Sequence, residues 1–226
     1  TERNLTISFA LSIKNIMTQN YSNEDLSSGK DMLLFAKDLF PLNRSIMGPD
    51  IRKSFKKFRD KHEEFKQIEF NTGDKVFDWT VPKEWIIKEA FIEHESGKRF
   101  ALFSENNLHL MGYSAPVDEI LTKDQLLKKI HTHPWDKSAI PYVTSYYKED
   151  WAFCMSINQV EALPSGNFRV FIDSQFLDGK LCLQEALIRG LSDKEIFFSS
   201  YLCHPSMANN EPVSYTHLTL PTTRLV

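Results

Sequence analysis

The chain of 226 residues lacks the features that would place it in a membrane, nucleic-acid-binding or nucleotide-binding class. It has no apolar stretch near the roughly 18 residues of a membrane span, and no GxGxxG or GxxxxGKS/T phosphate loop. Its formal net charge of −3 gives no electrostatic case for nucleic acid or an anionic membrane. We therefore expect neither nucleic acid nor a membrane as a partner; the sequence does not indicate an oligomeric state.

Cysteine is also scarce. Cys154, Cys182 and Cys203 show no CxxC spacing, and each lies in an apolar run. Buried, unbridged thiols are the simplest interpretation, and an odd number of them suits a reducing compartment. We expect a cytoplasmic protein.

Both ends of the chain differ in character from the rest. Residues 212–226 (PVSYTHLTLPTTRLV) match translated sequencing-library adapter, so we expect the natural part of this sequence to be cut off after Glu211. Met17 is the expected start of translation, which makes residues 1–16 upstream read-through. The apolar stretch at 7–13 is too short, and lacks the basic run, for a signal peptide.

Between these ends the sequence pattern changes twice. Residues 31–40 are densely apolar and stop before Pro41, and Pro49 opens a second helix that runs to about Glu64. From Phe65, short apolar runs alternate with turn signals, including a hairpin loop at 95–97. One helix interrupts these runs at 123–130, where Thr122 and Gln125 form a capping-box signature.

The last part of the chain combines strand signals with polar chemistry. Residues 168–172 and 180–187 are strand candidates around Asp178-Gly179, a hairpin-turn signal. Glu195–Leu202 is nearly continuously apolar, which predicts a strand buried on both faces of an α/β sheet. The segment Cys203-His204-Pro205-Ser206 follows at the carboxyl end of this strand, where open α/β sheets bind ligands.

Together these patterns predict an α/β protein interrupted by a small, inserted β-rich domain. The expected segments are 1–24 (read-through or disordered), 25–71 (helical start of the α/β domain), 72–160 (inserted β-rich domain), 161–211 (the α/β domain resumed and truncated) and 212–226 (adapter-derived tail).

His131-Thr132-His133-Pro134 begins like the HxHP zinc motif of deubiquitinase-type metalloproteases. The motif does not continue: Pro141 stands where its Ser is needed, and Lys148 or Lys137 where an Asp is needed. Two histidines do not make a zinc site, so we expect a structural or surface role for both. The other isolated histidines are expected at the surface or at interfaces: His62, His94 and His109.

His204 has a stronger context, because Asn209, Asn210 and Glu211 follow it closely. A divalent metal bound by imidazole and carboxylate oxygen is ordinary chemistry. On the residues alone, a single His with a nearby carboxylate is more often structural than catalytic.

Several stretches together resemble one family, the bacterial proteins with a zinc-aminopeptidase-like domain often named as polysaccharide biosynthesis proteins with an aminopeptidase-like domain. The matching stretches are LFPLNRSIMG (39–48), KVFDWTVPKEW (75–85), IPYVTSYYKEDWAFCMS (140–156) and SSYLCHPSMANNE (199–211). The resemblance implies a zinc-exopeptidase-like α/β domain with a β-rich insertion near its start.

The resemblance also implies a metal site. His204 matches the first zinc ligand, and the bridging carboxylate is expected a few residues later. Asn210 stands where the family has Asp, so Glu211 is the carboxylate that could replace it, and the number of metal ions is left open. The remaining ligands and the general base would lie beyond Glu211.

The implied activity is zinc-assisted hydrolysis of an amide bond in a peptide or an N-acylated sugar, with the metal activating water and a carboxylate relaying the proton. This chain alone would bind zinc weakly and be inactive. The alternative is a non-catalytic binding or scaffold protein that kept the fold and lost the metal site.

Overall fold

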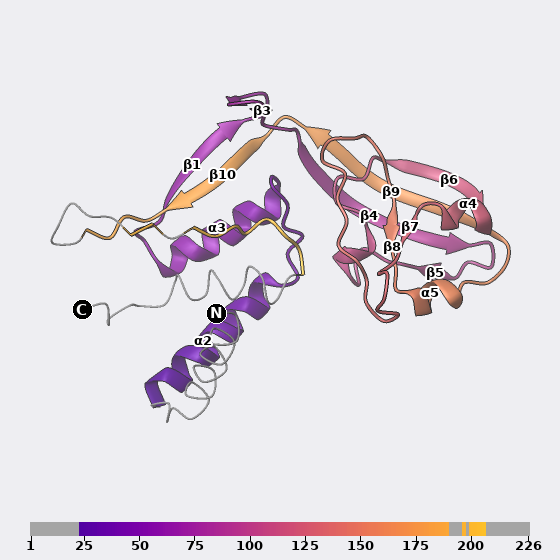
Figure 1. The fold of residues 1–226 in the computed structure, drawn as a ribbon, viewed down its shortest axis with the longest axis horizontal. Helices are drawn as coiled ribbons and strands as arrows, with labels where there is room; N and C mark the ends of the chain where they lie inside the picture. Colours follow the sequence, from indigo (N-terminus) through magenta and orange to yellow (C-terminus); the bar gives the residue numbers. More distant parts are fainter. Residues whose placement is uncertain (1–22, 190–195, 198, 207–226) are drawn as a thin grey trace, which may run out of the picture.

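The structure, a computed structural model, describes residues 23–189, 196–197 and 199–206. They form a mixed α/β arrangement in which two helices and a two-stranded ribbon adjoin a larger β-sheet unit (Figure 1). Within these residues, no helix is both long enough and apolar enough to cross a bilayer.

The two predicted helices are confirmed as α2 (Asn23–Leu39) and α3 (Pro49–Lys61). Pro49 occupies the first turn of α3, where its missing N–H leaves no hydrogen bond unmade. The preceding Gly48 has a φ of 138°, which disfavours any residue with a side chain. The helices pack through the rings of Phe35 and Phe58, which meet edge to face at 5.0 Å.

The ribbon consists of β1 (Lys66–Asn71) and β10 (Lys180–Glu185), which pair antiparallel with Lys66 opposite Glu185. Helix α3 lies beside it, and the Gln184 side chain donates a 2.8 Å hydrogen bond to the Phe55 carbonyl. At its far end the ribbon bends and continues into the larger sheet (Figure 1).

The largest sheet is antiparallel and four-stranded, in the order β5-β4-β9-β6. Its strands are β4 (Glu84–His94), β5 (Arg99–Phe100), β6 (Val117–Thr122) and β9 (Asn167–Leu177). Along β9 the buried residues Phe168, Val170 and Ile172 alternate with more exposed ones, because one face of the sheet covers the core. We call residues 84–177 the β module. The hairpin loop at 95–97 is confirmed, with Gly97 at a φ of 84°.

The core of the β module is closed by short elements between the strands. These are η1 (Asn107–His109), α4 (Lys123–Leu127), β7 (Ile130–His131), β8 (Phe153–Cys154) and α5 (Ile157–Glu161); a small hairpin of β2 (Lys75–Val76) and β3 (Trp79–Thr80) precedes the module. The capping box of Thr122 and Gln125 is confirmed at α4.

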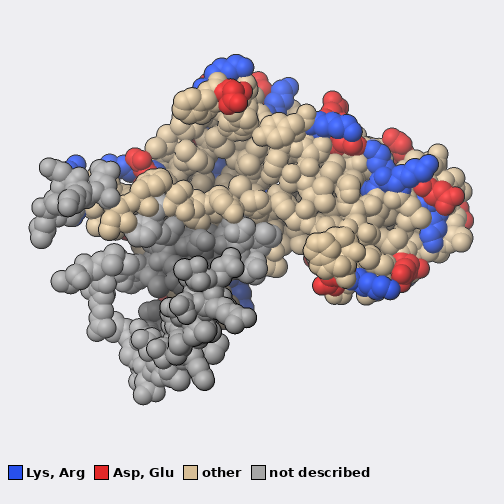
Figure 2. Space-filling view, in the orientation of Figure 1, with Lys and Arg blue, Asp and Glu red and all other residues tan. Residues whose placement is uncertain are grey.

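Along the upper and right edges of the β module in Figure 2, acidic and basic side chains lie next to one another. Arg169 binds Asp118 through two hydrogen bonds of 2.7 and 2.8 Å, and Arg99 binds Glu93 at 2.6 Å. The face shown therefore carries no extended patch of one charge.

Two expectations about strands are wrong. Asp178-Gly179 does not close a hairpin, since β9 pairs with β4 and β6 while β10 pairs with β1. Gly179 instead bonds to Thr72, donating to its hydroxyl and accepting from its backbone N–H, both at 3.0 Å, which bends the ribbon at this point.

The apolar run 195–202 does not form a buried strand in its described residues, where Ile196 and Phe197 are 80% and 89% exposed. A strand needs a hydrogen-bonding neighbour, and no described strand pairs with this segment. Leu202, by contrast, is buried against α2 and α3.

The domain boundaries at 72 and 160 stay a prediction. In the structure, β9 follows residue 160 and forms the sheet together with β4 and β6.

Candidate functional site

A small cavity lies where the helical part of the chain meets the β module. Its volume is about 10 Å³, close to that of one water molecule. Its walls come from the α2–α3 loop, the start of β4, η1, the β7–β8 connection and Pro205. The lining residues are Asn43, Arg44, Ser45, Trp85, Asn107, Leu110, Gly112, Tyr142, Tyr146 and Pro205. Segments far apart in sequence therefore converge beside His204.

The half-buried imidazole of His204 lies between two tyrosine rings. Its centroid is 5.1 Å from that of Tyr142 and 5.4 Å from that of Tyr201, both in edge-to-face geometry. The Sγ atom of Cys203 lies 3.8 Å from His204 Nδ1. Tyr142 belongs to the β module and Tyr201 to the segment of His204 itself, so two parts of the fold hold the ring.

A chain of aromatic contacts links this ring to the core of the β module. The Tyr142 and Tyr146 hydroxyls are 3.3 Å apart, Tyr146 meets Tyr113 edge to face at 4.8 Å, and Tyr113 stacks on Trp85 at 5.9 Å. Buried indole and phenol groups keep their hydrogen bonds: Trp85 Nε1 donates to Ser114 O at 2.9 Å, and the Tyr113 hydroxyl donates to Lys83 O at 3.1 Å. Burial raises the pKa of Tyr113, which keeps the phenol neutral.

The α2–α3 loop is fixed on the other side of the cavity. Arg44 is fully buried and its Nη1 donates to the Leu39 carbonyl at the end of α2. The Asn43 N–H donates to Asp50 Oδ2 at 2.9 Å, which ties the loop to the first turn of α3. These two hydrogen bonds therefore fix the backbone of the loop where it lines the cavity.

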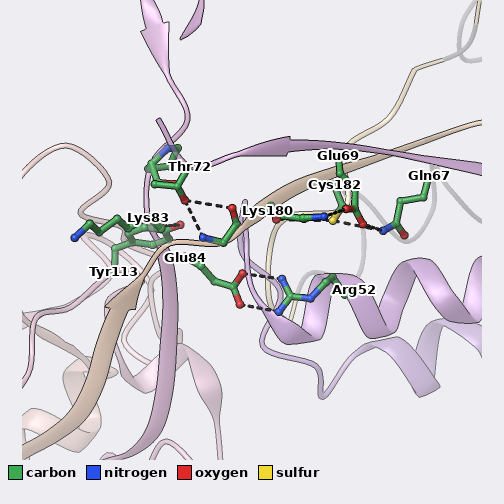
Figure 3. Close-up of polar contacts among 11 residues, drawn as sticks. Arg52, Gln67, Glu69, Thr72, Lys83, Glu84, Tyr113, Lys180 and Cys182 are labelled. Carbon is green, nitrogen blue, oxygen red and sulfur yellow. Dashed lines mark hydrogen bonds and ion pairs between the residues drawn. The ribbon is translucent and has the colours of Figure 1, made fainter. Parts of the chain in front are cut away.

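An open groove at the bend of the ribbon has a different character (Figure 3). Both terminal nitrogens of Arg52 donate to the Glu84 carboxylate at 2.7 Å, and Lys180 binds Glu69 at 2.5 Å. A side chain on Gly179 would place its Cβ 2.8 Å from that of Glu84, so glycine is required by close approach. Because these charges bind one another, we interpret this groove as a structural joint between α3, the ribbon and β4.

The described residues do not by themselves fit a zinc site. They contain no group of three or more His, Cys, Asp or Glu side chains placed to hold a metal ion, and His204 is a single imidazole. Asn210 and Glu211, the other two predicted ligands, lie outside the described residues. The metal-ligand prediction for all three residues therefore stays a prediction.

Four of the other histidines divide into two groups. His131 is exposed, and His133 Nδ1 accepts a 3.0 Å hydrogen bond from the Asp136 N–H, which fits the expected surface role. The expectation for His94 and His109 is wrong, because both are buried. Their rings can enter the core since His94 Nε2 lies 3.0 Å from Ser165 O and His109 Nδ1 donates to Cys154 O at 2.8 Å.

The three cysteines form no disulfide, and Cys154 and Cys182 are buried as expected. Burial raises the pKa of the Cys154 thiol to about 12.

Sequence reasoning did not identify Tyr142 as a neighbour of His204, or Asn107 as a neighbour of Ser206. Tyr142 lies within one of the stretches that carry the family resemblance, so that stretch held a signal. Asn107 has no sequence signal, since its role depends on a contact with Ser206, 99 residues away.

Comparison with known proteins supports the family resemblance. Residues 84–175, nearly the whole β module, match the model of a domain of unknown function, DUF2172. Over 190 residues, 84% of this chain, the sequence is 43% identical to a Clostridium acetobutylicum protein named "Putative polysaccharide biosynthesis protein with aminopeptidase-like domain". The chain spans 44% of that protein's length.

A solved structure is similar as well. The crystal structure of a "putative peptidase" from Clostridium acetobutylicum matches with a TM-score of 0.82 and 41% sequence identity, over 87% of this chain and 46% of the other.

Proposed function

We propose that the chain, which is similar to a polysaccharide biosynthesis protein with an aminopeptidase-like domain and to a putative peptidase, is part of a zinc-dependent hydrolase that cleaves amide bonds. The observation that carries the proposal is the placement of His204. The ring is half-buried, lies between Tyr142 and Tyr201, and is next to the junction of the helices and the β module. A metal ligand needs this combination of partial access and fixed orientation.

The proposal assigns His204 as the first zinc ligand. Glu211 is the candidate bridging carboxylate, with Asn210 at the position where Asp is expected. Catalytic zinc usually takes three protein ligands and a water, and the described residues supply one imidazole. The chain spans less than half of its curated relative, so the remaining ligands and the general base are proposed to lie in a longer protein.

The substrate is proposed to be a peptide or an N-acylated small molecule such as an amino sugar. The name of the relative supports a place in polysaccharide biosynthesis. Three cysteines without a disulfide support a cytoplasmic site of action.

The test is to measure zinc content and hydrolysis of aminoacyl and N-acyl-sugar substrates in the longer protein, before and after His204→Ala. We expect the substitution to remove both together. His131→Ala is the matched control, since it removes an exposed imidazole from the HTHP segment and should change neither. Stoichiometric zinc that survives His204→Ala would overturn the ligand assignment.

A second candidate is a non-catalytic binding or scaffold protein. It is favoured by Asn210 in place of Asp and by the lack of a metal-ligand cluster among the described residues. A longer protein that folds, carries no zinc and hydrolyses none of these substrates would support this candidate.

A further inference from the structure

The turn that carries His204 contains a backbone conformation that needs an explanation. Ser206 has a φ of 49°, in the left-handed region that residues with a side chain seldom adopt. Such a conformation is unfavourable and persists only where surrounding contacts impose it. The contacts of Ser206 therefore show what fixes the turn.

One contact comes from the β module. The Ser206 hydroxyl donates a 2.6 Å hydrogen bond to Asn107 Oδ1. Asn107 is the first residue of η1, whose N-cap Asn106 accepts a 3.0 Å hydrogen bond from the Leu108 N–H. The buried His109, at the other end of η1, is bonded to the Cys154 carbonyl. The acceptor for Ser206 is thus held on a well-anchored element.

The same side chain also touches the helical part of the chain. Asn107 Nδ2 lies 3.5 Å from the Pro41 carbonyl, in the loop that follows α2. Tyr142 contacts the His204 ring, and Pro205 lines the cavity with Asn107. His204 and Ser206 therefore both contact the β module, and the contact of Ser206 is a hydrogen bond made at the residue with the left-handed backbone.

We propose that Asn107 is a positioning residue for His204. By accepting from Ser206, its Oδ1 keeps the turn left-handed and so fixes the direction of the imidazole between Tyr142 and Tyr201. The functional meaning of this arrangement rests on the proposed role of His204 as a zinc ligand. Its structural part can be tested without any metal.

The test uses substitutions on both sides of the hydrogen bond. Asn107→Ala removes the acceptor and Ser206→Ala the donor, while both leave a side chain at the left-handed position. We expect either change to let the turn relax. Asn107→Asp keeps an acceptor oxygen and should preserve the turn. Ser206→Gly adopts the same φ without strain, so Ser206→Gly combined with Asn107→Ala should restore the wild-type turn.

The structural readout is the NMR signal of the His204 ring, identified by its loss in His204→Ala. In the wild type, ring currents from Tyr142 and Tyr201 should displace this signal from its random-coil position. We expect Asn107→Ala and Ser206→Ala to move it toward that position and the double variant to return it, with circular dichroism confirming that each variant is folded. A wild-type position in folded Asn107→Ala would overturn the proposal, as would failure of Ser206→Gly to rescue it.

The functional readout is zinc affinity of the longer protein, measured by competition with a chromophoric chelator. Asn107→Ala should weaken binding by about 10- to 100-fold, as expected for loss of a group that orients a ligand. Adding Ser206→Gly to Asn107→Ala should restore the zinc affinity. If the longer protein binds no zinc in any form, the proposed function fails while the NMR result still decides the positioning role; if Asn107→Ala leaves the zinc affinity unchanged, positioning of the ligand is refuted.

Discussion

At the scale of single residues, the buried histidines of the β module keep hydrogen bonds while they lose contact with water. His109 is only 5% exposed, and its Nδ1 donates to the Cys154 carbonyl. Burial lowers the pKa of His109 because the charged ring is poorly solvated there, and this outweighs the opposing effect of the carbonyl. The neutral ring is therefore the form that suits the core.

This burial predicts a pH-dependent stability. The pKa of His109 is lower in the folded than in the unfolded state, so below about pH 6.5 the unfolded chain binds more protons. The free energy of unfolding should then fall as the pH drops through this value, and it should be fully regained above it. Urea unfolding of the wild type and of His109→Gln at pH 8 and pH 5.5 provides the measurement. The decrease between the two pH values should be smaller in the variant, and an equal decrease in both proteins would contradict the role of His109.

At the scale of elements, local signals predicted the structure best. The proline and glycine at 48–49 correctly indicated the start of α3, and Thr122 with Gln125 correctly indicated the start of α4. Ser156 and Gln159 carry the same capping signature, and it could have revealed α5. These signals depend on neighbouring residues, so the sequence contains them in full.

Features that depend on distant residues could not be read in the same way. Asp178-Gly179 was expected to form a hairpin turn, but Gly179 instead lies at a bend where its N–H donates to the Thr72 hydroxyl. No local sequence pattern reveals this contact. His204 was found from the polar segment that follows an apolar run. Asn107 was not found, because its contact with Ser206 arises only from the tertiary structure.

The ion pair of Arg52 with Glu84 yields a prediction at this scale (Figure 3). The Glu84 side chain is 6% exposed and that of Arg52 38%, so solvent screens the arginine but not the carboxylate. Arg52→Ala should leave the buried carboxylate without this donor and lower the free energy of unfolding by roughly 1–3 kcal/mol. Lys53→Ala, on the exposed side of the same helix, should change it by less than about 0.5 kcal/mol. Equal effects in urea unfolding would show that the pair does not stabilise the joint.

At the scale of the whole molecule, the hydrophobic residues form separate cores. The largest lies entirely within the β module, with buried members from Trp85 to Ile172, and Ile46 is a partly buried contact from outside it. A second core joins α2, α3 and Leu202. Exposed apolar residues occur both in the β module, at Ile120 and Trp135, and outside it, at Ile188 and Phe197. The module has its own buried interior, because the largest core draws all of its buried members from it.

This separation predicts that the β module folds alone. A protein of residues 82–178 contains all four strands of the large sheet and its buried core, so it should unfold cooperatively in urea, with tryptophan fluorescence and far-ultraviolet circular dichroism changing together. A protein of residues 72–160 has the boundaries expected from the sequence pattern but lacks β9, which pairs with both β4 and β6. We expect it to show no cooperative transition.

Within the longer fragment, Phe168→Ala in the core should lower the free energy of unfolding by about 3–5 kcal/mol. Ile120→Ala, at a side chain that is 75% exposed, should lower it little. Cooperative unfolding of the 72–160 fragment would show that β9 is dispensable for folding. Non-cooperative unfolding of the 82–178 fragment would show that the module depends on the helices and the ribbon outside it. Either result would contradict the prediction.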